Sequence, residues 1–297
     1  MNRYANAAAF KQAVEARLRS SSSSGTDFAR RRQLLVFDRF LARLSLELGD
    51  AAMLKGGLVV ELRVERARTT KDIDLRLIGP PAELLERLER AARLEVGDFM
   101  VFSVAPDAEH PELTNEGMVY AGKRYRVDCA LAGKPYGQPF GLDIAFADPI
   151  FGEPDLVTAE DVLGFAGIAP PSLRLYPIET HIAEKLHAYT MPRKRPNSRV
   201  KDLPDIALLA GVRAIEAVGL RAALEQTFTS RKLQTLPVIF PPPQPAWTAP
   251  YARMAVEDEL QWGDLETLTR AVDAFLGPVL DGSATGTWSP STWRWGS

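Results

Sequence analysis

The sequence predicts an α/β (α+β) protein in which a mixed sheet domain precedes a helical C-terminal part. Between about residues 50 and 155, β-branched and aromatic runs alternate with helical runs, which is typical of a sheet covered by helices. After Tyr176 the apolar residues recur at helical spacing instead. We therefore divide the chain into N-terminal helices (1–49), a sheet domain (50–175) and a helical domain with a proline-rich strap (176–297).

The N-terminal part and the sheet domain contain a regular succession of elements. The expected order is helix (7–18), helix (from the serine-rich break at 20–27 to about 48), strand (51–54), helix (58–66), strand (73–78), helix (82–94) and strands (99–105, 118–131 and 139–147). Pro80 and Pro81 are expected to open the helix at 82, because proline is tolerated in a first helical turn.

The C-terminal part is expected to be helical except in a basic loop (193–201) and two further stretches. The stretch 236–250 is rich in proline, which cannot continue a helix, and predicts a surface strap. The last residues, 282–297, show too little periodicity to assign. They are expected to form a tail that pairs with another surface through Trp288, Trp293 and Trp295.

The composition is that of an ordinary globular protein, with 46% hydrophobic and 25% charged residues and a formal charge of −2. That charge excludes a globally basic protein, so affinity for nucleic acid must come from a local patch. Cys129 is the only cysteine, which excludes an intrachain disulfide and fits a reducing compartment. No apolar run is long enough to span a bilayer, and the N-terminus lacks the apolar core of a secretion signal. We therefore expect a cytoplasmic protein with no membrane partner.

Two aspartates at the start of a strand are the central motif. Asp72 and Asp74 flank Ile73, and because strand side chains alternate faces, the two acids share one face while the apolar residues share the other. Paired carboxylates in this position suit divalent metal ligation, with Mg²⁺ (or Mn²⁺) activating an attacking oxygen in a phosphoryl or nucleotidyl transfer. The alternative is a strand edge with two solvated acids.

Two glycines ahead of these acids add context. Gly56 and Gly57 allow backbone N–H groups to approach a phosphate, and the following helix offers its positive end. A plain tight turn is the alternative. The order of strand, Gly-Gly, helix and D-x-D strand resembles the nucleotidyltransferase fold shared with DNA polymerase β, whose metal-binding acids lie on the strand after such a turn.

A third acid is expected from a neighbouring strand, and two candidates exist. Asp143 lies in an apolar run, and its same-face neighbours are a glycine and an alanine, which cannot pair with it. A strand acid without a partner is destabilising, so we expect Asp143 to be the third metal ligand. Asp128 shares its face with Arg124 and Arg126, which favours a solvated, ion-paired face. It is kept as the alternative ligand.

Basic residues follow in the helical part. His181 and Lys185 lie at i, i+4 on one helical face, expected at the edge of the buried stripe, so that Lys185 reaches a triphosphate as a point charge. A surface salt bridge is the alternative. The next loop is expected to bind RNA, or else to be a solvated connection, through a cluster of cations: Arg193, Lys194, Arg195, Arg199 and Lys201.

Taken together, the motifs resemble the AbiEii/AbiGii toxin family of nucleotidyltransferases. The matching motifs occur in the family's order and cover about residues 50 to 210: K-G-G (55–57), R-x-T-x-D-I-D (68–74), L-D-I (142–144), E-K-L-H-A (184–188) and R-V-K-D-L-x-D (199–205). The family often has Gly-Ser where this chain has Gly-Gly, so phosphate contacts at Gly57 would rely on the backbone alone. The resemblance implies the toxin of a type IV-class toxin–antitoxin or phage-defence pair, related to mycobacterial enzymes that add nucleotides to tRNA 3′ ends.

The resemblance also implies roles for individual residues. Asp72 and Asp74 would bind metal, Lys185 would contact phosphate, and Asp202 and Asp205 would be catalytic or structural. The expected catalytic set is Asp72, Asp74, Asp143, Lys185 and Asp202. The expected nucleotide-binding set is Lys55, Gly56, Gly57, Arg68, Thr70 and Lys185.

These observations predict a Mg²⁺-dependent transfer of NMP from an NTP to an RNA 3′ end. The acceptor stem of tRNA is the expected RNA, a cognate antitoxin is the expected protein partner, and the result would be a block of translation and growth. One alternative is transfer of a nucleotide or phosphate onto protein, including the toxin's partner. Another is an inactive partner-binding module, against which the presence of all three acids argues.

Overall fold

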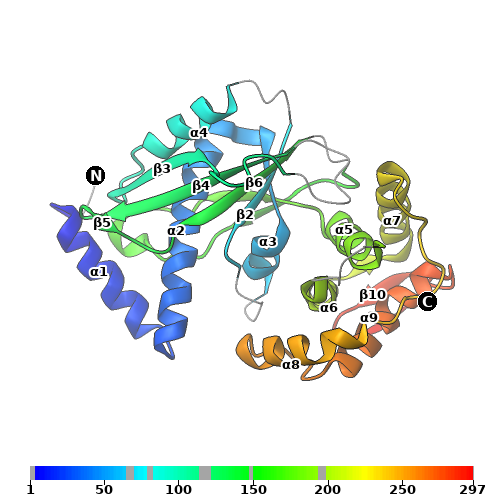
Figure 1. Cartoon of the computed structure of the whole chain (residues 1–297). Coiled ribbons are helices and arrows are strands. Elements are labelled where there is room, and N and C mark those ends of the chain that lie inside the picture. Colours follow the sequence, from blue (N-terminus) through cyan, green and yellow to red (C-terminus); the bar gives the residue numbers. More distant parts are fainter. Residues whose placement is uncertain are drawn as a thin grey trace.

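A mixed β-sheet forms the first half of the structure (Figure 1). The computed structural model describes residues 4–64, 70–78, 83–113, 122–146, 150–192 and 199–296. The strand order is β3-β4-β6-β2-β1-β8-β7, with β5 on the side of β4, and only the pairs β2–β6 and β1–β8 are parallel. The strands are β1 (Ala52–Lys55), β2 (Ile73–Leu77), β3 (Met100–Pro106), β4 (Gly122–Leu131), β5 (Lys134–Pro135), β6 (Phe140–Phe146), β7 (Asp155–Thr158) and β8 (Ser172–Leu175).

Three helices share the hydrophobic core of the sheet: α1 (Ala7–Ser20), α2 (Gly25–Leu48) and α4 (Leu84–Arg93). Asn6 and Ser24 cap α1 and α2, and each side chain accepts a hydrogen bond from the backbone N–H three residues later. Phe40 of α2 packs edge-on against Phe140 of β6, with ring centroids 5.6 Å apart. The N-terminal helices are therefore part of the core of the sheet.

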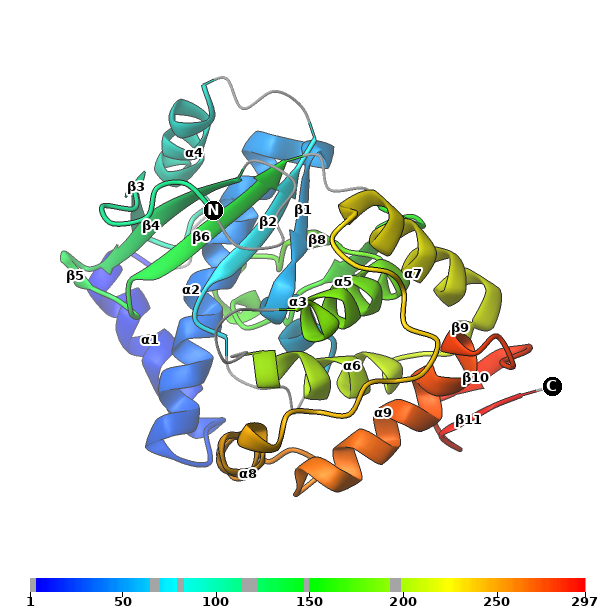
Figure 2. The same cartoon turned by 45° about the vertical axis from the view of Figure 1, so that its right-hand side comes forward.

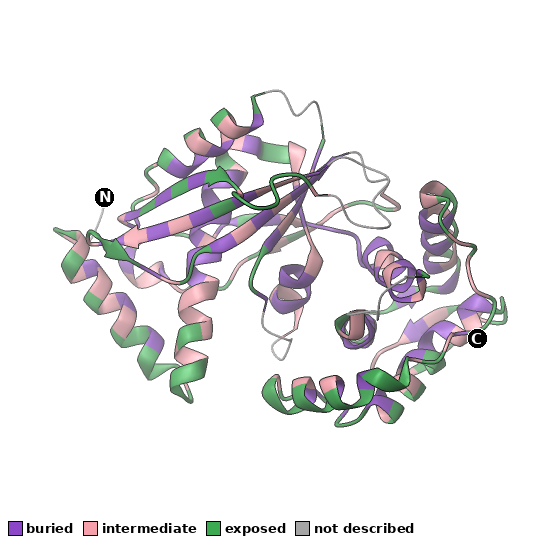
Figure 3. Cartoon of the chain, in the orientation of Figure 1, coloured by how far each residue is buried: buried purple, intermediate pink, exposed green. Residues whose placement is uncertain are grey.

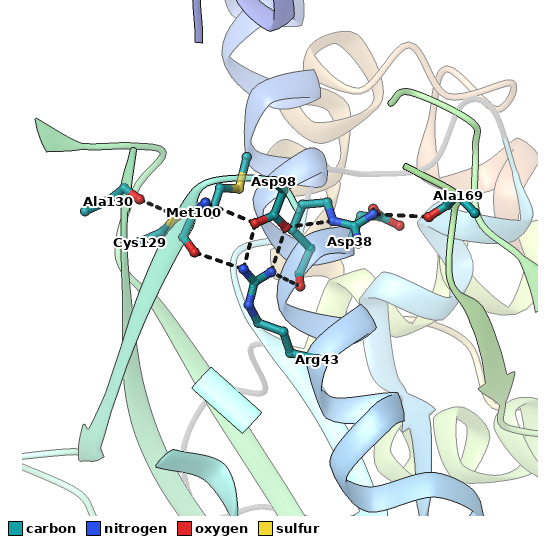
Figure 4. Close-up of polar contacts among 8 residues, drawn as sticks. Asp38, Arg43, Asp98, Met100, Cys129, Ala130 and Ala169 are labelled. Carbon is teal, nitrogen blue, oxygen red and sulfur yellow. Dashed lines mark hydrogen bonds and ion pairs between the residues drawn. The ribbon is translucent and has the colours of Figure 1, made fainter. Parts of the chain in front are cut away.

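A buried ion network fastens α2 to the loop before β3 (Figure 4). Arg43 donates to both carboxylate oxygens of Asp98 at 2.7 Å, and Arg39 donates to the same carboxylate at 3.0 Å. Arg43 also donates to the backbone carbonyl of Met100 at 2.9 Å. Arg39 also pairs with Asp38 at 3.3 Å, so the network contains two cations and two carboxylates. Their pairing makes the burial of these charges tolerable and fixes α2 against the sheet.

The second half is helical and has its own core, as the sequence predicted. Its helices are α5 (Ile178–Thr190), α6 (Asp202–Ala210), α7 (Ala217–Arg231), α8 (Thr248–Glu257) and α9 (Leu265–Leu280). Figure 3 shows α5 mostly buried and α8 mostly exposed. The proline-rich stretch crosses the surface as a strap, anchored where Phe240 stacks on Tyr189 with ring centroids 5.5 Å apart. The division at residue 175 stays a prediction.

One further helix connects the two halves. Helix α3 (Gly56–Arg63) contacts β2 on one side and α6 on the other, and its Val60 belongs to the helical core (Figure 2). None of the described helices has the length and apolarity that a membrane span needs.

The C-terminal tail packs through its tryptophans, as expected, and the surface that it covers belongs to the same chain. Strands β10 (Thr287–Ser289) and β11 (Arg294–Trp295) pair with each other, and β10 pairs with β9 (Ile215–Glu216). Trp288 is fully buried and donates its indole N–H to the Ala210 carbonyl at 2.9 Å. The tryptophans cover α6 and α9 of the same chain, and their indole N–H groups donate to the backbone carbonyls of Ala210, Ala271 and Phe275.

The mixed α/β fold is confirmed, with differences at element ends. Helix α3 begins at Gly56, two residues earlier than expected, and α4 begins at Leu84. Strands β7 and β8 were not predicted, because each has only four residues and their pairing joins distant segments. The expected strand residues 118–121 and 147, and the prolines expected to open α4, lie outside the described residues.

Candidate active site

Strand register places Asp74 and Asp143 side by side, and Asp72 lies near them. Asp74 of β2 is the direct partner of Asp143 on the parallel strand β6, so the two carboxylates point to the same face of the sheet. Asp72 lies just before β2, and its Oδ1 accepts a hydrogen bond from the Gly141 backbone N–H at 3.1 Å. On the other side of β2, Lys55 is the direct antiparallel partner of Asp74.

Glycines make room for two of these carboxylates. Gly56 has φ +71°, and a Cβ there would collide with the Asp74 carboxylate and lie 2.8 Å from the Asp74 Cβ. A Cβ on Gly141 would lie 2.7 Å from Asp72 Oδ1. Since Gly56 is also the first residue of α3, the positive N-terminal end of this helix lies directly against Asp74. Gly57 is buried in the same turn and offers only its backbone.

Asp74 is the most perturbed of the three acids. Burial and, to a lesser extent, the negative charge of Asp143 raise the pKa of its carboxyl to about 6, while Lys55 and Lys185 oppose the shift. Within the part of the chain that the structure describes, no group donates a hydrogen bond to this carboxylate. Asp74 therefore has negative neighbours and no direct cation.

Asp143 has a partner, contrary to the sequence expectation. Arg124 of β4 donates from Nε and Nη2 to its two carboxylate oxygens, both at 2.6 Å. Arg124 is the register partner of Asp143 on the neighbouring antiparallel strand, which inspection of one strand alone does not reveal. The ion pair raises the pKa of the Arg124 guanidinium.

Asp128 lies apart from this cluster. The paired segment of β4 and β6 ends at Val127 and Phe140, so Asp128 is beyond it, where its half-exposed carboxylate pairs with Arg126 at 3.4 Å. The expected ion-paired face thus involves Arg126 but not Arg124. Of the two candidates for the third acid, the geometry brings Asp143 to Asp74.

The acid cluster fits a divalent cation in its chemistry. Three carboxylates supply the hard oxygen ligands that Mg²⁺ and Mn²⁺ prefer. The pKa of Asp74 is raised first by burial and then by the negative charge of Asp143, and a bound cation would balance that charge. Among the described residues, no three acidic, histidine or cysteine side chains are gathered closely enough to form a complete metal site. A metal at Asp143 would compete with Arg124 for the carboxylate.

Lys55 makes an ion pair with an acid that the sequence did not single out. Its Nζ lies 3.3 Å from Glu184 Oε2 of α5 and 5.3 Å from the centre of the Tyr176 ring. Glu184 Oε1 also accepts from Arg231 Nη2 at 2.7 Å and from the Tyr176 hydroxyl at 3.2 Å. Burial alone would raise the pKa of Glu184, but Lys55 and Arg231 lower it to about 2. Glu184 is part of the E-K-L-H-A motif, whereas nothing in the sequence points to Arg231.

Lys185 is buried rather than at the edge of the apolar stripe. Its Nζ lies 2.6 Å from Asp205 Oδ2 and 3.2 Å from Asp202 Oδ1, and both acids are buried as well. Its helical neighbour His181 is also buried, which lowers the pKa of the imidazole to about 3, and within the described residues neither ring nitrogen has a hydrogen-bond partner. Lys185 therefore carries its charge inside a structural ion triad.

The remaining predicted residues are placed only in part. Thr70 is buried, and its backbone N–H donates at 3.1 Å to Glu61, which also accepts from Arg30 at 2.7 Å. Glu61, which the sequence analysis missed, thereby anchors the segment that leads to Asp72. Arg199 is half-buried with its Nη1 3.8 Å from Asp202, and Lys201 is exposed. Four predicted site residues lie outside the described residues: Arg68, Arg193, Lys194 and Arg195.

Comparison with known proteins gives a family and a fold. The family model for the nucleotidyl transferase AbiEii toxin of type IV toxin–antitoxin systems matches residues 39–293. The structure of MenT4, the nucleotidyltransferase toxin Rv2826c from Mycobacterium tuberculosis H37Rv, is similar over 95% of this chain and 98% of that chain, with 14% identity and a TM-score of 0.54. JHP933 from Helicobacter pylori aligns over 88% of this chain and 93% of its own, with 17% identity and a TM-score of 0.49.

No curated protein sequence matches the chain. The family match nevertheless covers most of its length and includes the strand that carries Asp72 and Asp74, the Lys185 helix and the Trp288 strand. The chain is a nucleotidyltransferase and belongs to the AbiEii toxin family of type IV toxin–antitoxin systems.

Proposed function

We propose that this toxin transfers a nucleoside monophosphate from an NTP to the 3′ end of an RNA, with tRNA as the acceptor and Mg²⁺ or Mn²⁺ as the cofactor. The observation that carries the proposal is the register pair of Asp74 and Asp143, with Asp72 beside them and the N-terminus of α3 against Asp74. To position a nucleoside triphosphate, a site needs acids that hold a cation and a helix end that binds phosphate.

Each group has a defined task in this reaction. Asp72, Asp74 and Asp143 would hold the metal, which supplies electrostatic stabilisation of the attacking and leaving oxygens. The backbone N–H groups at Gly56 and Gly57 would contact the phosphates. The oxygen of the RNA 3′ hydroxyl would form a bond to the α-phosphorus and release its proton to solvent water, while the bond from the α-phosphorus to the leaving pyrophosphate breaks. In this proposal Lys185 contributes positive charge from within its triad with Asp202 and Asp205, and Lys55 contributes it from the end of β1.

The RNA would be held by the loop between α5 and α6. Arg199 closes this loop next to Asp202, and three further cations, Arg193, Lys194 and Arg195, precede it in the sequence. Positive side chains at the rim of the site would neutralise acceptor phosphates. The chain as a whole has a formal charge of −2, so its net charge gives no general attraction for RNA.

The test is to follow label from each of the four α-³²P-labelled NTPs. The purified toxin is incubated with total tRNA and the purified cognate antitoxin in Mg²⁺, and RNA and protein are separated. We expect label on RNA, sequencing of RNA 3′ ends to show added nucleotides, and Asp74→Asn to abolish both. Label on the antitoxin or on the toxin itself would favour transfer onto protein, and the absence of label from every acceptor would favour an inactive binding module.

A further inference from the structure

Lys55 pairs with Glu184 rather than with its strand neighbour Asp74. Lys55 and Asp74 are direct partners on adjacent antiparallel strands, and such partners point to the same face with Cβ atoms about 5 Å apart. An ion pair between them is therefore the simplest arrangement. Instead, the Lys55 ammonium lies 3.3 Å and 3.5 Å from the two carboxylate oxygens of Glu184, and no described group donates a hydrogen bond to Asp74.

We propose that Glu184 is a positioning residue that holds Lys55 away from Asp74, so that the Asp74 carboxylate stays open to a divalent metal. The inference rests on the metal dependence proposed above. It adds a task for two residues outside the acid cluster, because Arg231 in turn holds Glu184 in place.

The surroundings of Glu184 are built for this task. Three donors from three elements converge on its carboxylate: Lys55 at the end of β1, Tyr176 after β8, and Arg231 at the end of α7. Glu184 and Arg231 are each largely buried, so their charges need one another and the geometry is fixed. Since the pKa of Glu184 is about 2, its carboxylate stays ionised and attracts Lys55 throughout the neutral range.

The electrostatic reason is competition for one carboxylate. A lysine ammonium bonded to Asp74 would occupy an acceptor oxygen and place positive charge where a cation has to bind. The second lysine near Asp74 is Lys185, and its ammonium group is also bound by other acids, Asp202 and Asp205. Both lysines thus remain within electrostatic range of Asp74 while their hydrogen bonds go to other acids.

The experiment measures Mn²⁺ affinity of the metal-stripped, full-length protein by electron paramagnetic resonance of free Mn²⁺. The main variant, Glu184→Gln/Arg231→Gln, removes one negative and one positive charge together and so keeps the net charge. We expect it to weaken Mn²⁺ binding about tenfold, and the addition of Lys55→Met to restore the affinity to within about threefold of wild type. Lys55→Met alone should change affinity by less than about threefold. The matched control is Glu179→Gln/Arg213→Gln, which removes a 3.0 Å ion pair between Glu179 of the same helix and the more exposed Arg213 beyond α6, and it should leave Mn²⁺ affinity unchanged.

Each outcome bears on a different statement. If the wild type binds no Mn²⁺, the proposed metal dependence fails and this inference fails with it. If the wild type binds Mn²⁺ and the Glu184→Gln/Arg231→Gln variant binds it equally well, only the positioning role is overturned. Weakening that Lys55→Met does not restore also overturns it, because a merely structural role predicts that result.

A second variant guards against misfolding of the first. Glu184→Asp keeps the charge and shortens the side chain by one methylene, so Lys55 is held less well while the fold is retained. Its Mn²⁺ affinity should fall by about threefold and be restored by Lys55→Met. Unchanged affinity in a folded Glu184→Asp variant would count against the proposal.

Discussion

Replacing Asp74 by asparagine should stabilise the metal-free protein at neutral pH while abolishing transfer. Burial and Asp143 raise the pKa of the carboxyl from 3.8 to about 6, so between these values the folded protein binds more protons than the unfolded chain. The free energy of unfolding therefore falls as the pH rises through this window. At about 1.4 kcal/mol per pH unit over roughly two units, ionised Asp74 costs about 3 kcal/mol above pH 6. The neutral amide has nearly the same shape and removes that cost.

Urea unfolding of the wild type and of Asp74→Asn in EDTA at pH 4, 6 and 8 measures the effect. The gain of the variant should be near zero at pH 4 and approach about 3 kcal/mol at pH 8. In Mn²⁺ the wild type should gain stability by mass action, and the variant should gain less. Asp128→Asn, whose carboxylate is half-exposed on β4, is the control and should show neither effect. Equal stability of wild type and Asp74→Asn at pH 8, or a gain that does not depend on pH, would refute the reasoning.

Four further outcomes are expected. Asp143→Ala should abolish transfer of labelled nucleotide and Asp128→Ala should keep most of it; the reverse would move the third ligand to β4. Lys185→Met removes the cation that two buried carboxylates share and should lower the unfolding free energy in urea by about 3–5 kcal/mol. A loss below about 1 kcal/mol would show that Lys185 is not needed to balance these carboxylates. Alanine at all three positions 193–195 should weaken tRNA binding and flatten its salt dependence, with NTP affinity unchanged. Equal tRNA affinities and equal salt dependence in wild type and variant would contradict the RNA-binding role. Loss of antitoxin binding alone would indicate that the loop binds the antitoxin. Trp288→Ala should cost about 3–5 kcal/mol because the ring is fully buried against α6 and α9, and unchanged thermal unfolding would show that the tail contributes no stability.

The sequence by itself determined the features that depend on residues a few positions apart along the chain. The alternation of Ile73, Leu75 and Leu77 fixes which face of β2 is buried, and so places Asp72 and Asp74 together on the other face. The K-G-G motif marks a turn at the start of a helix, whereas the positive φ of Gly56 and its close approach to Asp74 came only from the structure. Helical periodicity located α5, because one turn of a helix involves only residues within four positions of each other.

Only the tertiary structure decided which charges pair. Arg124 binds Asp143 because of strand register. Glu184 binds Arg231 because α5 packs against α7, and it binds Lys55 because this part of α5 lies next to the end of β1. These partners are 19, 129 and 47 positions apart, so no periodicity in one segment can reveal them. For the same reason an acid that looks unpaired on its own strand can be bound bidentately by the next strand. Pairing of distant charges is set by how elements pack, and packing is driven by apolar burial rather than by the charges themselves.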